Sequence, residues 1–221
     1  MSYLLSKFHH FLILLSLLLL SQTIFANELA SECEQLYQAQ DVDAAYEVCR
    51  AAAEEGDAQA QYYLSVFYQI GIIVEPDRNE SLKWLHAASE QGHAESTAAI
   101  AGILSNWMNT RHREYVDFFE SNRFLRLAIQ QGHVESQFVL ARRYFLGHGI
   151  TRNYTKAQMW LYISEASGYL TRDEQGNIPL IQHSLENVNM FRKLNSSLST
   201  NQQLIALRMA NKCIYSNFKE C

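Results

Sequence analysis

The sequence has few residues that interrupt helices and none of the familiar short motifs for phosphate or zinc. Its 221 residues include 2 prolines and 9 glycines, while 48% are hydrophobic. A chain with so many apolar side chains can build an ordered domain, which argues against disorder. Neither form of glycine-rich phosphate loop is present, and cysteine and histidine do not recur at zinc-ligand spacing. We therefore expect a folded chain with no cofactor and no metal.

An excess of positive charge is also missing. Lysine and arginine total 18 against 23 aspartates and glutamates, so the formal net charge is -5. A protein that binds nucleic acid needs a basic face to displace phosphate counterions. The charge balance therefore argues against nucleic acid as a partner.

Long apolar runs are limited to the first residues. Lys7 precedes an apolar run at residues 11–20, and polar residues then lead to the small residue Ala26. The run is shorter than the roughly 20 residues of a membrane-spanning helix, and this order is typical of an export signal. We predict a signal peptide at 1–26, no membrane insertion after cleavage, and a periplasmic or secreted mature protein.

Four glycines mark an internal repeat. Gly56, Gly92, Gly132 and Gly168 are spaced by 36, 40 and 36 residues, a period typical of stacked helical hairpins. Large, small and large residues follow the first three glycines at offsets of eight, nine and twelve: Leu64, Ser65 and Tyr68; Ile100, Ala101 and Leu104; Leu140, Ala141 and Tyr144. This spacing predicts a packed helix face in each unit.

The second helix of each hairpin has a predicted start. Fifteen residues before each of the four glycines stands a short polar residue that can cap a helix: Asp41, Asp77, Asp117 and Asn153. Glu80 could complete a capping box with Asp77. The four extra residues of the middle unit are expected between its helices, around residues 108–116.

The predicted organisation has three parts. After the signal peptide, a solenoid spans 27–170, with a capping hairpin at 27–56 and repeats at 56–92, 92–132 and 132–168. Residues 171–221 then form a loop, at 171–179, and C-terminal capping helices. The first of these helices is expected at 180–194. Ser199 and Gln202 form a capping-box signature before the last, expected at 202–213.

The four cysteines follow the signal and form one pair near each end of the chain. An even number of cysteines in an exported chain favours disulfides. Pairing across the chain would require both tips of an elongated solenoid to meet, so we prefer Cys33 with Cys49 and Cys213 with Cys221. Eight helical residues span about 12 Å, too far for a disulfide. The tail from Ser216 should therefore turn back.

These residues resemble the Sel-one-like repeat (SLR) family of tetratricopeptide-like solenoids. Motif positions of that family are matched in the first full unit by Ala60, Leu64, Tyr68, Gly71, Val74, Asp77, Trp84, Ala87, Ala88 and Gly92, and in the third by Leu140, Tyr144, Gly147, Gly149, Ile150, Asn153, Lys156, Ala157, Trp160 and Gly168. Ile73 replaces the second turn glycine of the motif, and the middle unit keeps fewer matches. The resemblance implies an all-α, right-handed α-α superhelix and an adaptor that holds protein partners.

Candidate chemistry in the sequence is sparse. His93 and His133 share a repeat position directly after a glycine and are interpreted as helix-start residues. Ser216 and Lys219 form the S-x-x-K pattern of serine beta-lactamases and penicillin-binding proteins, but the accompanying S-D-N and K-T-G elements are missing. We therefore predict no catalytic residues and retain penicillin binding or beta-lactam hydrolysis as an alternative.

Partner binding is predicted on the first helices of the repeats. Tyr62, Phe138, Arg142 and Phe145 lie beside the core stripe, and Tyr, Phe and Arg are types common in interface hot spots. Aromatic residues at helical spacing are also typical of a core. The leading hypothesis is a non-enzymatic, exported adaptor for a protein or peptide. A second alternative is an assembly factor for an envelope machine such as a flagellar motor.

Overall fold

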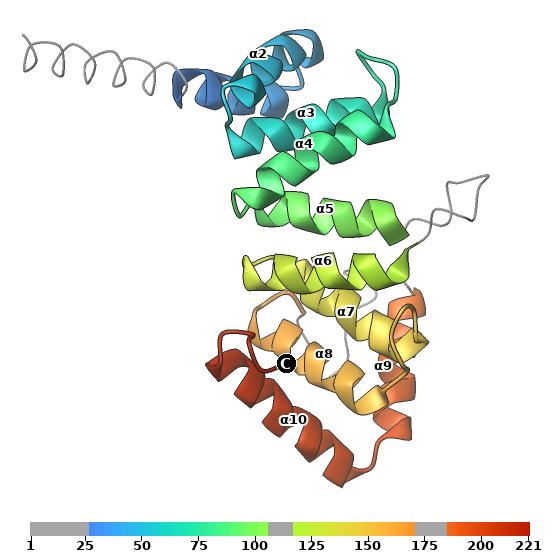
Figure 1. Ribbon diagram of the computed structural model, residues 1–221. Helices are drawn as coiled ribbons and strands as arrows, with labels where there is room; N and C mark the ends of the chain where they lie inside the picture. The colour runs from blue at the N-terminus through green and yellow to red at the C-terminus, as the bar shows by residue number, and fades with distance from the viewer. Residues whose placement is uncertain (1–26, 106–116, 171–184) are drawn as a thin grey trace, which may run out of the picture. The chain divides into compact units, whose positions relative to one another are not determined.

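The computed structural model describes residues 27–105, 117–170 and 185–221, and all regular structure in these residues is helical (Figure 1). The chain forms two compact units, one ending at His93 and the other beginning at Ala94. The predicted signal peptide at 1–26, the long middle loop around 108–116 and the loop at 171–179 lie outside the described residues.

Antiparallel pairs of neighbouring helices build both units. In the first unit, residues 27–38 are helical and are followed by α2 (Val42–Glu54), α3 (Ala58–Ile70) and α4 (Arg78–Glu90). The second unit contains α5 (Ala94–Ser105), α6 (Phe118–Gln130), α7 (Val134–Leu146), α8 (Tyr154–Ala166), α9 (Leu185–Ser197) and α10 (Thr200–Tyr215). The main packed pairs are α3 with α4, α5 with α6, and α7 with α8. The hairpin prediction is confirmed.

All four predicted helix caps are present. The side chains of Asp41, Asp77, Asp117 and Asn153 accept hydrogen bonds from backbone N–H groups in the first turns of α2, α4, α6 and α8. In the last three, the cap's own N–H donates to a carbonyl of the preceding helix, at Tyr68, Leu104 and Tyr144 respectively, each at 2.9 Å. These bonds join the start of each second helix to the first helix of its hairpin.

The capping box predicted for Glu80 is only half formed. Asp77 accepts from the backbone of Asn79 and Glu80, but the Asp77 N–H donates to the Tyr68 carbonyl. The Glu80 carboxylate pairs instead with Lys83, at 3.0 Å. The tertiary bond to Tyr68 therefore replaces the local bond that a capping box requires.

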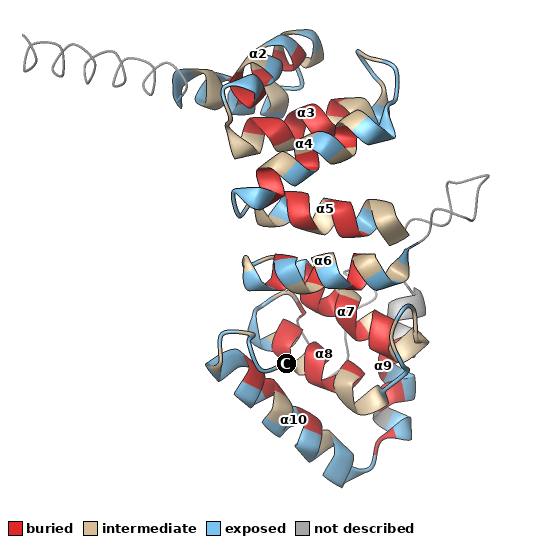
Figure 2. Ribbon diagram, in the orientation of Figure 1, coloured by how far each residue is buried: buried red, intermediate tan, exposed pale blue. Residues whose placement is uncertain are grey.

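The repeat positions form the core. Leu64, Ile100 and Leu140, eight residues after the glycines, have no exposed surface. The small residues that follow them are also buried, which lets the helices approach closely. Figure 2 shows the buried faces of these helices within each unit. Each unit has a hydrophobic cluster of its own, one around Leu64 and one around Leu140.

The C-terminal helices differ in extent from the prediction. Residues 185–197 form α9, which ends three residues later than expected, and α10 begins two residues earlier and ends two residues later than expected. Ser199 and Gln202 form the predicted capping box. After α10, Asn217 and Phe218 adopt left-handed conformations with φ of 51° and 62°, so the tail turns back as expected.

The structure places both predicted cysteine pairs at bonding distance. The Cα atoms are 4.7 Å apart for Cys33 and Cys49 and 4.9 Å apart for Cys213 and Cys221, within the range that disulfides occupy. One bridge lies in each unit. Among the helices described, none combines the length and apolar character of a membrane span.

Candidate functional site

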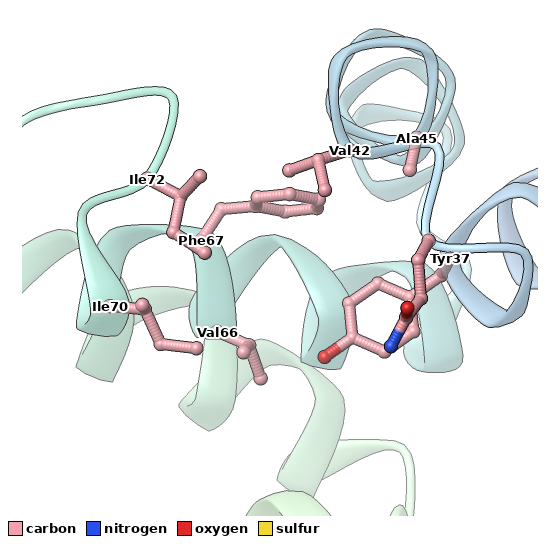
Figure 3. A pocket seen from close by; sticks show the side chains of 8 residues that line it. Tyr37, Val42, Ala45, Val66, Phe67, Ile70 and Ile72 are labelled. Carbon is pink, nitrogen blue, oxygen red and sulfur yellow. The ribbon is translucent and has the colours of Figure 1, made fainter.

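An apolar groove of about 400 Å³ opens in the first unit (Figure 3). Helix 27–38 contributes Tyr37, the following turn contributes Gln40, and α2 contributes Val42 and Ala45. The opposite wall comes from α3 and the loop after it, with Val66, Phe67, Ile70 and Ile72. Seven of the eight lining residues are therefore hydrophobic, and their size suits an apolar ligand group.

Phe67 forms the floor of the groove. Phe67 is 5% exposed. The centre of its ring lies 6.0 Å from the centre of the Tyr37 ring and 5.5 Å from that of the Tyr46 ring, and both pairs are edge-to-face. Figure 3 shows the Phe67 ring directed toward Val42. The aromatic contacts hold the floor in one position, while the small side chain of Ala45 leaves room above it.

Two isoleucines expose their side chains at the rim. Ile70 is 58% exposed and Ile72 is 61% exposed. Between them, Gly71 caps α3 in the left-handed region, with φ of 73°. A Cβ at Gly71 would lie 2.3 Å from Cγ of Pro76, so only glycine fits this turn. The turn is what places Ile72 beside Phe67.

The unit that contains the groove is strongly acidic. Residues 27–93 contain 3 basic and 13 acidic residues, a net charge of -10. Tyr63, which stacks on Tyr37 at 4.0 Å, has a raised pKa because of burial and then the nearby Glu34 charge. The phenol therefore stays neutral at physiological pH. The groove thus offers apolar contact within a unit of negative net charge.

The four predicted binding residues do not line this groove. Tyr62 is half-buried on α3, 5.8 Å from the Tyr63 ring and 5.4 Å from the His93 ring. The other three lie in the second unit. Arg142 is half-buried, and Phe145 stacks on Tyr154 at 5.3 Å with Lys193 over its ring. Tyr62, Arg142 and Phe145 keep part of their surface exposed.

Phe138 is a correction to the predicted surface. It is 4% exposed, and its ring lies 6.0 Å from Tyr169 and 5.9 Å from Phe191 of α9. Tyr169 and Phe191 cover this position. The prediction of Phe138 as a binding residue is therefore wrong for the folded chain, because its ring belongs to the core.

The histidines that follow the repeat glycines have structural roles. His133 is the N-cap of α7, where its Nδ1 accepts from the Ser136 N–H. His93 bonds Gln59 at 3.0 Å. Within the described ranges, no three potential metal ligands gather together.

The Ser216 hydroxyl is engaged by the backbone of its own tail. It donates to the Cys213 carbonyl at 2.9 Å and accepts from the Glu220 N–H at 3.0 Å. Lys219 is exposed. The arrangement favours a role for Ser216 in the turn that closes the second disulfide.

Sequence reasoning missed a polar contact that closes the hairpins. In the first unit, Gln91 Nε2 donates to Gln61 Oε1 at 3.0 Å. At the same repeat positions in the second unit, the Thr97 hydroxyl donates to the Gln131 side chain. The signal was a glutamine directly before Gly92 and Gly132. The groove gave no such signal, because its lining comes from segments separated by loops.

Comparison with known proteins identifies the repeats. The Sel1 repeat family model matches residues 58–93 and 134–169. A search of curated proteins gave no significant match. One similar solved structure is a Sel1 repeat protein from Oxalobacter formigenes, with 19% identity, a TM-score of 0.50, and coverage of 73% of this chain and 67% of that one.

Another is a protective antigen of uropathogenic Escherichia coli strains that displays an SLR fold, with 20% identity and a TM-score of 0.42. The match covers 79% of this chain and 42% of that one. The Oxalobacter formigenes structure supports the predicted fold class, an α-α superhelix of helical hairpins. Two stretches of the chain, residues 58–93 and 134–169, therefore match the Sel1 repeat, within an all-α helical-repeat fold.

Proposed function

We propose that this protein is an exported, non-enzymatic adaptor that binds an apolar segment of a partner protein in the groove of its first unit. The observation that carries the proposal is the exposure of Ile70 and Ile72 beside a groove floored by Phe67. Exposed apolar side chains around a concave surface typically mark an interaction site. The Sel1 fold is consistent with protein binding.

Export rests on two independent features. The first 26 residues have the order of a signal peptide, and the described cysteines are all paired. Disulfides persist in oxidising compartments such as the bacterial periplasm or the extracellular space. Both features support a mature protein that works in the cell envelope or outside the cell.

Binding is favoured over catalysis by the chemistry of the groove. Among the described residues that line the groove, Tyr37 is the single titratable side chain, whereas general acid–base catalysis requires positioned groups that exchange protons near neutral pH. The bonds of Ser216 give no support to the beta-lactam alternative. An assembly factor for an envelope machine would be one form of the same adaptor.

A peptide-selection experiment tests the groove. The oxidised chain from residue 27 onward would select peptides from a phage-displayed random library, and fluorescence anisotropy would give their Kd. We expect selected peptides to share closely spaced apolar residues and to bind Ile72→Asp at least tenfold more weakly. Phe119→Asp is the matched control, because Phe119 is 73% exposed in the second unit. Equal affinity for the two variants, or selection of no peptide, would contradict the proposal.

A further inference from the structure

The groove positions recur in the second unit with different chemistry. Counting from Gly56 and Gly132, which are 76 residues apart, each position of the first unit has a counterpart. Phe118 corresponds to Val42, and His148 corresponds to Ile72. Val66 and Phe67 correspond to Arg142 and Arg143. The same places in the repeat thus change from aliphatic or aromatic residues to two arginines, a histidine and a phenylalanine.

Arg143 is a buried cation with no polar side-chain partner among the described residues. Arg143 is 9% exposed, and its Nε atom is buried with no hydrogen-bond acceptor among the described residues. No ion pair or hydrogen bond joins its guanidinium to another described residue. The guanidinium carbon lies 4.6 Å from the centre of the Phe118 ring, which stacks on the His148 ring at 4.9 Å. The aromatic pair holds the guanidinium but does not neutralise it.

The carboxylates on the adjacent helix are engaged elsewhere. Asp117 caps α6 by accepting from the Glu120 N–H, and Glu120 pairs with Arg123 at 2.8 Å. The neighbouring Arg142 adds a second positive charge. Burial and then the Arg142 charge lower the pKa of Arg143 to about 10. Arg143 is therefore protonated at neutral pH, and its charge is not compensated within the described part of the second unit.

Packing alone does not explain this arginine. Burying a charge without a partner is costly, and the first unit fills the same repeat position with Phe67. A guanidinium stacked on an aromatic face can donate two parallel N–H hydrogen bonds to a carboxylate. Residues 94–221 contain 14 basic and 10 acidic residues, a net charge of +4, in contrast to the acidic first unit.

We propose that Arg143, supported by Arg142 and the Phe118 ring, binds a carboxylate side chain on an acidic segment of a protein partner. The site is distinct from the apolar groove and selects the opposite chemistry. It goes beyond the proposed function, since it does not depend on what the groove binds.

Nuclear magnetic resonance of the arginine side chains tests the site. Hexaglutamate peptide would be titrated into the oxidised, ¹⁵N-labelled chain from residue 27 onward, at constant ionic strength. We expect a saturable shift of the Arg143 Nε–H signal, with hexaglutamine and hexalysine giving none. Arg143→Met should weaken peptide binding at least tenfold. Arg123→Met is the control, because Arg123 is exposed and pairs with Glu120, and it should retain most of the affinity.

Several outcomes would overturn the proposal. Absence of a shift with hexaglutamate, or equal binding by the Arg143→Met and wild-type chains, would remove Arg143 as the receptor. Equal shifts with inorganic phosphate at the same charge concentration would show an adventitious ion only. Analytical ultracentrifugation of the chain without peptide tests whether it forms dimers. Salt-sensitive dimers lost in Arg143→Met would show that the acidic first unit of a second copy, rather than another protein, fills the site.

Discussion

The first and third repeats share a scaffold and differ at one set of positions. Leu64 and Leu140 are both fully buried, and Asp77 and Asn153 cap the second helices in the same way. The difference is at Phe67 and Arg143, where one repeat has a ring and the other a cation. Positions that build the hairpin are thus constrained by packing, whereas positions that face the groove can change. We expect the positions that face the groove to determine which partner the chain binds.

The loops that follow α3 and α7 also differ, because they pass residues of different size. The first unit has Ile73 where the second has Gly149. A Cβ at Gly149 would lie 2.6 Å from both the carbonyl carbon and the Cβ of Phe118. The glycine is therefore needed where the loop passes Phe118, the residue whose ring lies against the Arg143 guanidinium. Val42 occupies the corresponding place in the first unit and is smaller.

Replacing the side chains at these two positions, Phe67 and Arg143, should give the largest effect. Phe67→Arg would place a charge among the Tyr37 and Tyr46 rings and should lower the free energy of unfolding by about 4 kcal/mol. Arg143→Met should raise it by about 1 kcal/mol, because it removes an uncompensated buried charge. Urea denaturation of both variants checks this. If Arg143→Met lost stability as Phe67→Arg does, the two positions would not differ in the way we infer.

Removing the first disulfide should have the next largest effect. Cys33→Ala with Cys49→Ala opens a link across 16 residues, and the chain-entropy term for such a loop is about 3 kcal/mol. The link across 8 residues between Cys213 and Cys221 should contribute slightly less, about 2.5 kcal/mol. Hydrogen exchange would show the loss in α2 and α3 for the first pair. Loss of protection in α8 and α10 instead would contradict this assignment.

Gly149→Ala should lower the free energy of unfolding by about 2 kcal/mol. Gly149 has a left-handed backbone with φ of 68°, which alanine disfavours, and the added Cβ would approach Phe118 too closely. Ile73→Ala is the control at the corresponding position of the first unit. Because Ile73 is 38% exposed, its replacement should cost well under about 1 kcal/mol. Thermal unfolding of the two variants measures the difference, and equal melting temperatures would refute it.

The smallest predicted effect is a gain. Gln137 Oε1 is buried without a hydrogen-bond partner in the described chain, and it corresponds to Gln61, which accepts from Gln91. Ser167 stands where Gln91 would be. Ser167→Gln should supply the missing donor and stabilise the second unit by about 1 kcal/mol. Ser167→Glu has nearly the same shape but no donor. A similar gain from Ser167→Glu would rule out this bond as the cause.

Local signals predicted the hairpins better than the binding surfaces. Short polar residues at fixed distances from the glycines predicted four caps correctly, because capping depends on a side chain and its own first turn. The prediction for Phe138 failed because the ring is covered by Phe191 from another helix. No spacing within α7 could show which segment would close the last repeat.

The sequence by itself determined the period of the hairpins, the starts of their second helices and the preferred cysteine pairs. These features arise from contacts within one hairpin or one turn, whose geometry is the same wherever the motif occurs. The tertiary structure decided which side chains are available for binding. Ile70 and Ile72 are exposed and Phe138 is buried because segments distant in the sequence either cover a position or leave it open.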